Sequence, residues 1–575
     1  MSRLFAFEST PGLVGAMADH RLPIAPSEVE ALTRALAGRL SIELPQGGAD
    51  MPAGVTEQWL AAITSDLQNH RGASIVMAGD GQPPIVHALA HAINRQLENV
   101  GKTVEYIEPA EARPEDQLAS LKTLVDDMDA GEVDLLVIID GNPVYNSPAV
   151  LDFAGKLEKV PFTVHLSQHY DETSFLCHWH LPAAHFLESW GDVRAFDGTA
   201  SIVQPLIAPL YDGRTAYDLM SVLQGHADRG TFETVQQYWR KRLASADFGR
   251  VWRKAVHDGI VPDTKSTPRD VDLSFDGRDT EQREQPSGTG SFEIVFAPDP
   301  CVWDGRFANN GWLQELPKPL TKLTWDNAIY ISPQTAESEQ LANGDMVELT
   351  VVDRTLAAPI WIVPGQADGV VSLSLGYGRQ RSGRVGDGVG FSAYQIRPAT
   401  GAWFASGVEL RKTGRRYQLA ATQDHYSMQG RDIVQFGTLH EFQSEPNFLL
   451  AGHPSMSRED SHQPFKLDTL YPDEKSDFPE RNENDNAWGM VIDQTACVGC
   501  NACVIACQAE NNIPIVGKEQ VSSGREMQWL RIDRYYVGTA DDPDTYFQPM
   551  LCQHCEKAPC ELVCPVGATV HSSEG

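Results

Sequence analysis

The stretch "CVGCNACVIACQAENNIP", residues 497–514, holds four closely spaced cysteines. A second stretch, "CQHCEKAPCELVCPVGA", residues 552–568, holds four more. Eight of the ten cysteines of the chain therefore lie in two short segments. Such clustering favours the binding of a metal or a metal cluster over a framework of disulfide bonds.

The first quartet has the spacing C-x2-C-x2-C-x3-C, which is typical of bacterial ferredoxins. Three thiolates in a tight loop can surround one corner of an iron–sulfur cube, whereas the fourth begins a helix and ligates a different cluster. The second quartet has the spacing C-x2-C-x4-C-x3-C, and Pro565 follows it as in the C-P ending of ferredoxins. We therefore predict that all eight cysteines are iron ligands: Cys497, Cys500, Cys503, Cys507, Cys552, Cys555, Cys560 and Cys564.

Zinc is the competing interpretation of the quartets. Structural zinc usually takes four ligands as two separated pairs, and two dense quartets without regularly spaced histidines fit that pattern poorly. His554 lies between two predicted ligands, and we expect it to pack or to hydrogen-bond to a cluster. Cys177 and Cys301 stand apart and are interpreted as packed or free thiols.

The spacing leaves open which cysteines share a cluster. Eight thiolates suffice for two [4Fe–4S] clusters if Cys564 completes the first triad and Cys507 completes the second. However, the connection between the quartets is longer than in a minimal two-cluster ferredoxin and includes a predicted strand in residues 525–538. The four-residue gap in the second quartet is also unusual there.

Length and charge limit the possible classes of protein. A chain of 575 residues is too long for one core and predicts about three to five domains. The net charge of -32 argues against binding to nucleic acid or to an anionic lipid surface. No apolar run approaches the roughly 20 residues that span a bilayer. The start, "MSRLFAFEST", has no signal-peptide pattern and includes a predicted strand at Leu4–Phe7, so we expect the chain to begin inside a domain or to lack its own export signal.

Residues 1–262 alternate between strand and helix signals. This βαβα order predicts a parallel sheet with helices on both faces. The predicted strands are residues 73–82, 103–109 and 133–143, and the predicted helices are residues 83–101 and 115–132.

The signals change after residue 262. Residues 263–290 and 441–488 are polar and are predicted to be linkers. Residues 291–440 contain short strand signals, such as "MVELTVVD", "APIWIVPG" and "GVVSLSLGYG", which indicate a β-barrel-like domain. Residues 489–575 form a ferredoxin-like α+β domain that carries the quartets. The predicted fold class is therefore multidomain α/β with a barrel and an iron–sulfur domain.

The sequence outside the quartets offers weak candidates for other sites. Cys177 is the only cysteine near a suggestive loop, and His178 and His180 are interpreted as packing residues. The glycine-rich loop 376–390 carries Arg379, Arg381 and Arg384 and could cradle a phosphate, but we interpret it as a mobile loop or a protein interface. We predict no molybdenum ligand and no catalytic residue.

The two quartets resemble the first two of the four quartets in the iron–sulfur subunits that partner molybdopterin oxidoreductases, such as polysulfide and dimethyl sulfoxide reductases. In that family the first quartet crosses with the fourth and the second with the third. The resemblance therefore implies that the clusters are completed by ligands outside residues 1–575. Residues 177–220 resemble part of the molybdopterin oxidoreductase fold, and residues 343–378 resemble its β-barrel domain.

Together with residues 9–22, 304–328 and 425–431, these features make the chain similar to the large iron–sulfur subunit of alternative complex III. The resemblance implies a periplasmic electron-transfer subunit without molybdopterin, with three [4Fe–4S] clusters and one [3Fe–4S] cluster. It also implies an integral-membrane quinol-binding subunit and c-type cytochrome subunits as partners. The family usually has a twin-arginine signal, further upstream sequence and two more quartets, so we expect this chain to be a fragment or one part of a split subunit.

Two other functions stay open at this point. The chain could be a catalytic molybdopterin oxidoreductase of the polysulfide or tetrathionate type, fused to its ferredoxin subunit. It could also be a scaffold that uses clusters only for stability. Metal analysis separates the first alternative from electron transfer, and redox titration separates the second.

Overall fold

The computed structural model describes residues 3–43, 51–52, 54–273, 290–400, 402–431, 433–445, 489–555 and 558–570. The chain forms two compact units. The first comprises Met1–Thr422, Ile515–Arg525 and Ala540–Asp542, and the second comprises Gln423–Pro514, Glu526–Thr539 and Pro543–Gly575. Most of both predicted linkers, residues 274–289 and 446–488, lies outside the described residues. The domain boundaries inferred from the sequence stay predictions.

The first unit begins with two parallel strands, β1 (Phe5–Glu8) and β2 (His20–Pro23), and the predicted strand at Leu4–Phe7 is confirmed. Three helices follow, α2 (Val29–Arg39), α3 (Glu57–Asn69) and α4 (Pro84–Gln96). Thr56 caps α3 by accepting the Trp59 N–H. The apolar faces of the helices share one core that includes Leu32, Leu36, Leu60, Ile63, Leu89 and Ile93.

The strands predicted at residues 73–82 and 103–109 are wrong. Among the described residues, residues 74–79 form no strand, and Val104 makes only an isolated bridge with Val100. At residues 73–82 the side chain of Asn94 offers a reason, because its Oδ1 accepts the Val76 N–H at 2.9 Å and its Nδ2 donates to the Val76 carbonyl at 2.7 Å. A buried side-chain amide thus satisfies backbone groups that a partner strand would otherwise satisfy.

The predicted parallel sheet is present further along the chain. Helix α5 (Gln117–Ala130) leads into β3 (Leu135–Ile139), and the sheet order is β3, β4 (Phe162–Ser167), β5 (Trp179–Pro182). Asp116 caps α5 by accepting the N–H groups of Leu118 and Ala119, and Gly131 ends it with a φ of 73°. Helices α6 (Pro143–Asn146), α7 (Phe153–Leu157) and α8 (Glu172–Leu176) connect the strands.

A smaller cluster follows this sheet. Strands β6 (Gly191–Arg194) and β7 (Ala200–Val203) are antiparallel. Helices α9 (Ala216–Leu223), α10 (Thr231–Leu243) and α11 (Phe248–Asp258) come next in the chain. Trp239 of α10 and Trp252 of α11 are buried in the core that α10 and α11 share with β7. The Trp239 Nε1 donates to Asp192 at 2.8 Å, so the buried indole keeps a hydrogen-bond partner.

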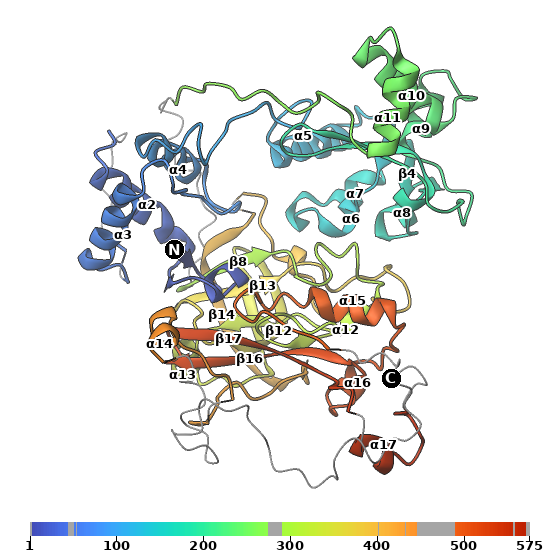
Figure 1. Ribbon diagram of the computed structural model, residues 1–575. Coiled ribbons are helices and arrows are strands. Elements are labelled where there is room, and N and C mark those ends of the chain that lie inside the picture. Colours follow the sequence, from blue (N-terminus) through green and yellow to red (C-terminus); the bar gives the residue numbers. More distant parts are fainter. Residues whose placement is uncertain are drawn as a thin grey trace, which may run out of the picture. The chain divides into compact units, whose positions relative to one another are not determined.

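A closed six-stranded barrel confirms the predicted β-barrel-like domain (Figure 1). Its core is continuous, and Ile294, Val347 and Ile360 are completely buried. Helices α12 (Gly311–Glu315) and α13 (Pro333–Ser338) lie between its strands in the sequence. The strand order is β10 (Ile329–Ile331), β12 (Arg354–Ile362), β11 (Asp345–Val351), β14 (Phe404–Arg416), β8 (Phe292–Ala297) and β13 (Val370–Ser374).

The second unit contains most of the cysteine region. Helix α15 (Ala502–Glu510) packs against β16 (Leu530–Gly538), which pairs antiparallel with β17 (Pro543–Leu551). The strand predicted within residues 525–538 is therefore confirmed. Helix α14 (Leu439–Ser444) precedes this region, and α17 (Pro559–Val563) follows it. Among the residues that the structure describes, no helix has the length and apolar character of a membrane span.

Candidate iron–sulfur site

The first quartet lies in a loop that runs into α15. Gly499 has a φ of 71°, and a Cβ at this position would lie 2.3 Å from Phe547, so the tight loop requires glycine. Asn501 is also left-handed, with a φ of 62°, and it directly precedes α15. The helix therefore begins before the third cysteine, not at the fourth as expected. Cys503 and Cys507 consequently lie one helical turn apart on the same side of α15.

The three thiols of the first triad influence one another. Partial burial raises the pKa of Cys503, and the nearby Cys500 and Cys497 raise it further. The three cysteines of this triad lie within seven consecutive residues, 497–503, at the start of α15. Within the described ranges, however, no group of three or more His, Cys, Asp or Glu side chains is arranged to hold a metal ion. The structure therefore gathers the first triad in one loop without forming a complete ligand set.

The second quartet follows strand β17. Cys552 and Cys555 lie in the loop after the strand, and the Cys552 N–H donates to the Trp529 carbonyl at 3.4 Å. Cys560 lies in α17, and Cys564 is the residue that ends this helix. Three of these thiols are exposed, at Cys552, Cys555 and Cys560. His554 is exposed and has a φ of 49°, and residues 556–557 lie outside the described residues.

The surroundings of Cys564 suit a thiolate. The chain turns back after Pro565, and the Ala568 N–H donates to the Cys564 Sγ at 3.2 Å. Hydrogen bonds from the backbone of Ala568, and then of Val566, hold the pKa of this thiol below its usual range. Gly567, with a φ of 61°, allows the turn. Backbone N–H groups aimed at a cysteine sulfur are the donors that an iron–sulfur cluster ligand requires.

Cys507, the fourth cysteine of the other quartet, also accepts a hydrogen bond at sulfur. The Asn511 Nδ2 lies 3.5 Å from the Cys507 Sγ. The residues present therefore fit cluster ligation at both fourth positions, because each sulfur has an N–H donor in place. Sequence reasoning missed Asn511, although it lies four residues after Cys507 in the same quoted stretch.

The β16–β17 hairpin accounts for the long connection between the quartets. Leu530 pairs with Leu551, so the chain returns beside its starting point directly before Cys552. The Gly499 loop lies against Phe547 of β17. The length of the connection is therefore no argument against pairing between the two quartets, since the hairpin folds that length back on itself.

The arginine-rich loop holds an anion that belongs to the protein. Arg379 is buried, and its Nη2 donates to the Glu172 carboxylate at 2.8 Å. The backbone N–H groups of Gln380 and Arg381 donate to the same carboxylate at 2.8 and 3.0 Å. Burial opposes the charge of Glu172, yet the contacts with Arg379, Asn142 and Gln380 lower its pKa to about 2.

Residues 376–390 were interpreted as a mobile loop or a protein interface. For Arg379 this interpretation is wrong, because its side chain is buried and pairs with Glu172. Arg381 lies over the ring of Phe175 at 3.5 Å from the ring centroid, and Arg384 is exposed. The loop does bind an anion, as its glycines and arginines suggested. The anion is the Glu172 carboxylate, and the 207 residues between the partners hid the pair from sequence reasoning.

The remaining candidates make contacts that are typical of packing residues. The His178 Nδ1 pairs with the Thr163 hydroxyl at 2.9 Å, and the His180 Nε2 lies 3.0 Å from the Ser167 carbonyl. Burial raises the pKa of the half-buried Cys177. Cys301 is buried, and burial raises its pKa to about 12. A thiol with such a pKa is inert at neutral pH.

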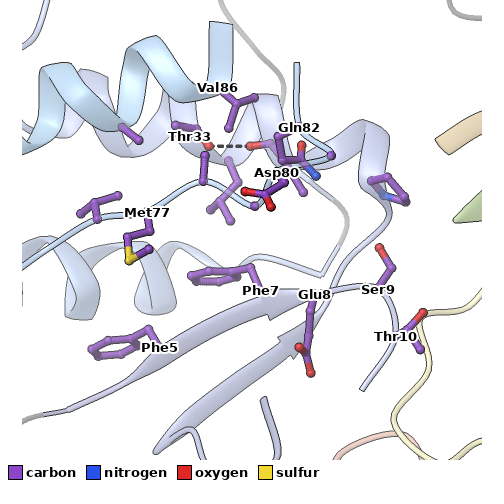
Figure 2. Close-up of a pocket in the computed structure, with 18 of the residues that line it drawn as sticks. Phe5, Phe7, Glu8, Ser9, Thr10, Thr33, Met77, Asp80, Gln82 and Val86 are labelled. Carbon is purple, nitrogen blue, oxygen red and sulfur yellow. Dashed lines mark hydrogen bonds between the residues drawn. The ribbon is translucent and has the colours of Figure 1, made fainter. Parts of the chain in front are cut away.

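A cavity of about 990 Å³ in the first unit was also missed by sequence reasoning. Figure 2 shows Phe5 and Phe7 on β1, with Met77 and Val86 across from them. Glu8 lines the cavity too, but its carboxylate pairs with Arg21 at 2.8 Å. The signal in the sequence was the continuous apolar run of residues 75–78, which was assigned to a strand. No cysteine is among the described residues that line the cavity, so it is not part of the thiol site.

Comparisons with known proteins agree with the thiol chemistry. Residues 496–568 match the family model of the 4Fe-4S dicluster domain. Over 89 residues the chain is 40% identical to the menaquinone reductase iron–sulfur cluster-binding subunit of Nitratidesulfovibrio vulgaris, covering 15% of this chain and 34% of that protein. Over 112 residues it is 30% identical to an iron–sulfur subunit of the Hdr-like menaquinol oxidoreductase of Archaeoglobus fulgidus, covering 17% and 40%. The chain thus spans well under half of the length of the curated relatives it matches.

The fold also has a neighbour among the solved structures. The structure is similar to acetylene hydratase from Pelobacter acetylenicus, with a TM-score of 0.50 and 12% identity, over 71% of this chain and 74% of that one. At this identity the likeness concerns the fold alone. The chain therefore combines a fold similar to that of acetylene hydratase with a region, residues 496–568, that matches the 4Fe-4S dicluster domain.

Proposed function

We propose that this chain is an electron-transfer iron–sulfur subunit of a membrane-associated quinol-oxidising complex. The observation that carries the proposal is the dicluster domain, in which all eight clustered cysteines fall. Hydrogen-bond donors at the sulfurs of Cys507 and Cys564 support the ligand assignment. Relatives of the dicluster domain that are named as menaquinone reductase and menaquinol oxidoreductase subunits support the link to quinones.

The proposed ligands divide into two triads and two fourth cysteines. When bound, a [4Fe–4S] cluster supplies a carrier for one electron. The protein's part is to hold the thiolates, to exclude water and to direct N–H groups at sulfur, and these determine the reduction potential. Such a task requires no acid, base or nucleophile, and we assign no catalytic residue to this chain.

The finer assignment is to alternative complex III. Its support is the sequence resemblance, together with the union of the two folds in one chain. In this assignment the subunit lies on the periplasmic face of the membrane and passes electrons from an integral-membrane quinol-binding subunit to c-type cytochrome subunits. One of its clusters is a [3Fe–4S] cluster.

The source of the fourth ligands is part of the proposal. Following the family pattern, we assign the fourth ligands to cysteines outside residues 1–575. The alternative, which the β16–β17 hairpin permits, is that each quartet supplies the fourth ligand of the other. Anaerobic reconstitution of the chain alone with iron and sulfide separates the two. We expect incomplete, unstable clusters, whereas a stable product with about eight irons per chain would establish pairing within the chain.

The rival function is a catalytic molybdopterin oxidoreductase, and its support is the sequence resemblance of residues 177–220 and 343–378 to that class of enzyme. A pterin cofactor carries phosphates that need a cradle of N–H donors. In the arginine-rich loop, Glu172 already takes the donors of Arg379, Gln380 and Arg381. We therefore propose that the chain binds no molybdopterin.

The proposal can be tested on the purified complex. Addition of a menaquinol analogue under anaerobic conditions should reduce at least one cluster, as seen by electron paramagnetic resonance, and a soluble c-type cytochrome should reoxidise it. A scaffold would keep its clusters in one redox state throughout the potential range between quinol and cytochrome, and that result would contradict electron transfer.

A further inference from the structure

Asn511 links the end of α15 to a predicted cluster ligand. The helix ends at Glu510, and Asn511 is the residue that caps it. The Asn511 Nδ2 donates to the Cys507 carbonyl at 2.9 Å and lies 3.5 Å from the Cys507 Sγ. An amide nitrogen carries two hydrogens, so it can serve both acceptors at once.

The hydrogen bond from the Asn511 side chain to the Cys507 carbonyl orients the same side chain toward the Cys507 Sγ. The last carbonyls of a helix have no partner within the helix, and the Cys507 carbonyl is among them. It accepts both the Asn511 backbone N–H, at 3.1 Å, and the Asn511 side chain. The side chain is therefore anchored by a strong acceptor, which leaves its second N–H directed at the sulfur.

We infer that Asn511 is a positioning residue that raises the reduction potential of the cluster to which Cys507 belongs. This inference rests on the proposed function, because it requires a cluster at Cys507. Reduction adds one electron, and part of the added negative charge falls on the ligand sulfurs. A neutral N–H directed at one of these sulfurs stabilises the reduced state more than the oxidised state.

Asn511 is well suited to a test because its donor is a side chain. At Cys564 the corresponding donor is the backbone N–H of Ala568, which substitution does not remove. Asn512 provides a matched control, because it is the same residue type one position later and is also exposed. The described structure records no hydrogen bond from the Asn512 side chain to a cysteine sulfur.

The experiment is a redox titration of the purified complex, monitored by electron paramagnetic resonance at pH 8 with mediators and dithionite. The variants are Asn511→Leu, which removes the donor, Asn511→His, which offers a ring N–H near the same position, and Asn512→Gly, which changes no charge and suits the φ of 48° at this position. For Asn511→Leu we expect one cluster's ratio of reduced to oxidised forms to fall up to about tenfold at a fixed potential, which is 59 mV for a one-electron couple. Asn511→His should restore most of the ratio.

The outcomes separate this inference from the proposed function. Unchanged potentials for all clusters in Asn511→Leu would overturn the inference while leaving electron transfer intact. An equal shift in Asn512→Gly would also overturn it, because any substitution at this exposed end of the helix would then have the same effect on the potential. If the Asn511→Leu complex loses the cluster at Cys507, the Asn511→His complex decides. A cluster signal that returns in Asn511→His supports the role of the donor, and a missing signal in both variants refutes that role. A wild-type complex without clusters would instead refute the proposed function.

Discussion

In the barrel Ile294, Val347 and Ile360 are completely buried, whereas in the cysteine region five of the eight predicted ligands are exposed. The barrel forms a closed sheet around a continuous apolar core. The cysteine region has a two-stranded sheet, and a single hairpin is marginal in water without further packing. From this comparison we expect that the barrel is stabilised by its own side chains, whereas the cysteine region depends on the binding energy of its clusters.

The largest expected effect follows from removing the clusters. Anaerobic chelation of iron should abolish hydrogen-exchange protection in α15, β16 and β17, because metal binding and folding are coupled in small cluster domains. Protection of the barrel strands should change little. Mass-spectrometric hydrogen exchange of the holo and chelated protein measures both at once. Equal protection of the hairpin in the two samples would show that apolar packing alone maintains the cysteine region.

Single ligand substitutions sharpen the comparison within the cysteine region. Cys500→Ala and Cys555→Ala should each remove one paramagnetic signal, and the two lost signals should differ, because the cysteines belong to different triads. The control is Cys301→Ala, a buried thiol of the first unit, which should leave all the cluster signals in place. Loss of the same single signal in both ligand variants would mean that the two quartets build one cluster.

The Glu172–Arg379 pair tests the stability of the first unit. Glu172→Gln leaves the buried Arg379 without a charged partner and should cost about 3 kcal/mol in the free energy of unfolding. Denaturant titration of the holoprotein, followed by tryptophan fluorescence, measures this change. Glu348→Gln is the matched control, since Glu348 pairs with the exposed Arg411 and should cost well under 1 kcal/mol. A similar loss of unfolding free energy in both variants would show that the Glu172–Arg379 pair stabilises the protein no more than a surface pair does.

The same pair predicts a dependence on pH. The folded pKa of Glu172 is about 2, below its usual value of 4.5, so the carboxylate contributes stability above the unfolded pKa. That contribution should disappear as the pH falls from about 4.5 to about 2. The difference in unfolding free energy between wild type and Glu172→Gln should therefore shrink over this range. A constant difference would indicate that the pair does not hold the ionised carboxylate.

The smallest expected effect comes from the barrel core. Ile360→Val removes one methylene from a completely buried side chain and should destabilise the protein by about 1 kcal/mol. The cluster potentials should stay unchanged. Chemical denaturation and the redox titration together check the two expectations. A shift in the cluster potentials would show that the barrel core influences the clusters. That result would contradict the expectation that the barrel and the cysteine region are stabilised independently.

The barrel and the cysteine quartets could be recognised from the sequence because both patterns are local, although the assignment of the eight cysteines as ligands stays a prediction. Alternating apolar residues, as in residues 346–353, reflect burial on one face, and that pattern is local. The cysteine spacing is local as well. The predicted strand at residues 73–82 failed where the Asn94 side chain satisfies the Val76 backbone, and at residues 103–109 the Thr103 and Val104 N–H groups donate to the Asn99 carbonyl in a turn; no periodicity reveals either contact. The carboxylate in the arginine-rich loop was unpredictable because Glu172 is distant in sequence.

Elemental analysis of the purified complex tests the central claim most directly. Iron, acid-labile sulfide, molybdenum and tungsten are measured per chain in the same sample. The account predicts iron and sulfide in nearly equal amounts, with neither molybdenum nor tungsten in stoichiometric quantity. Molybdenum or tungsten at one per chain would contradict it and would favour the catalytic molybdopterin oxidoreductase, and the absence of iron and sulfide would refute the assignment of the cysteines.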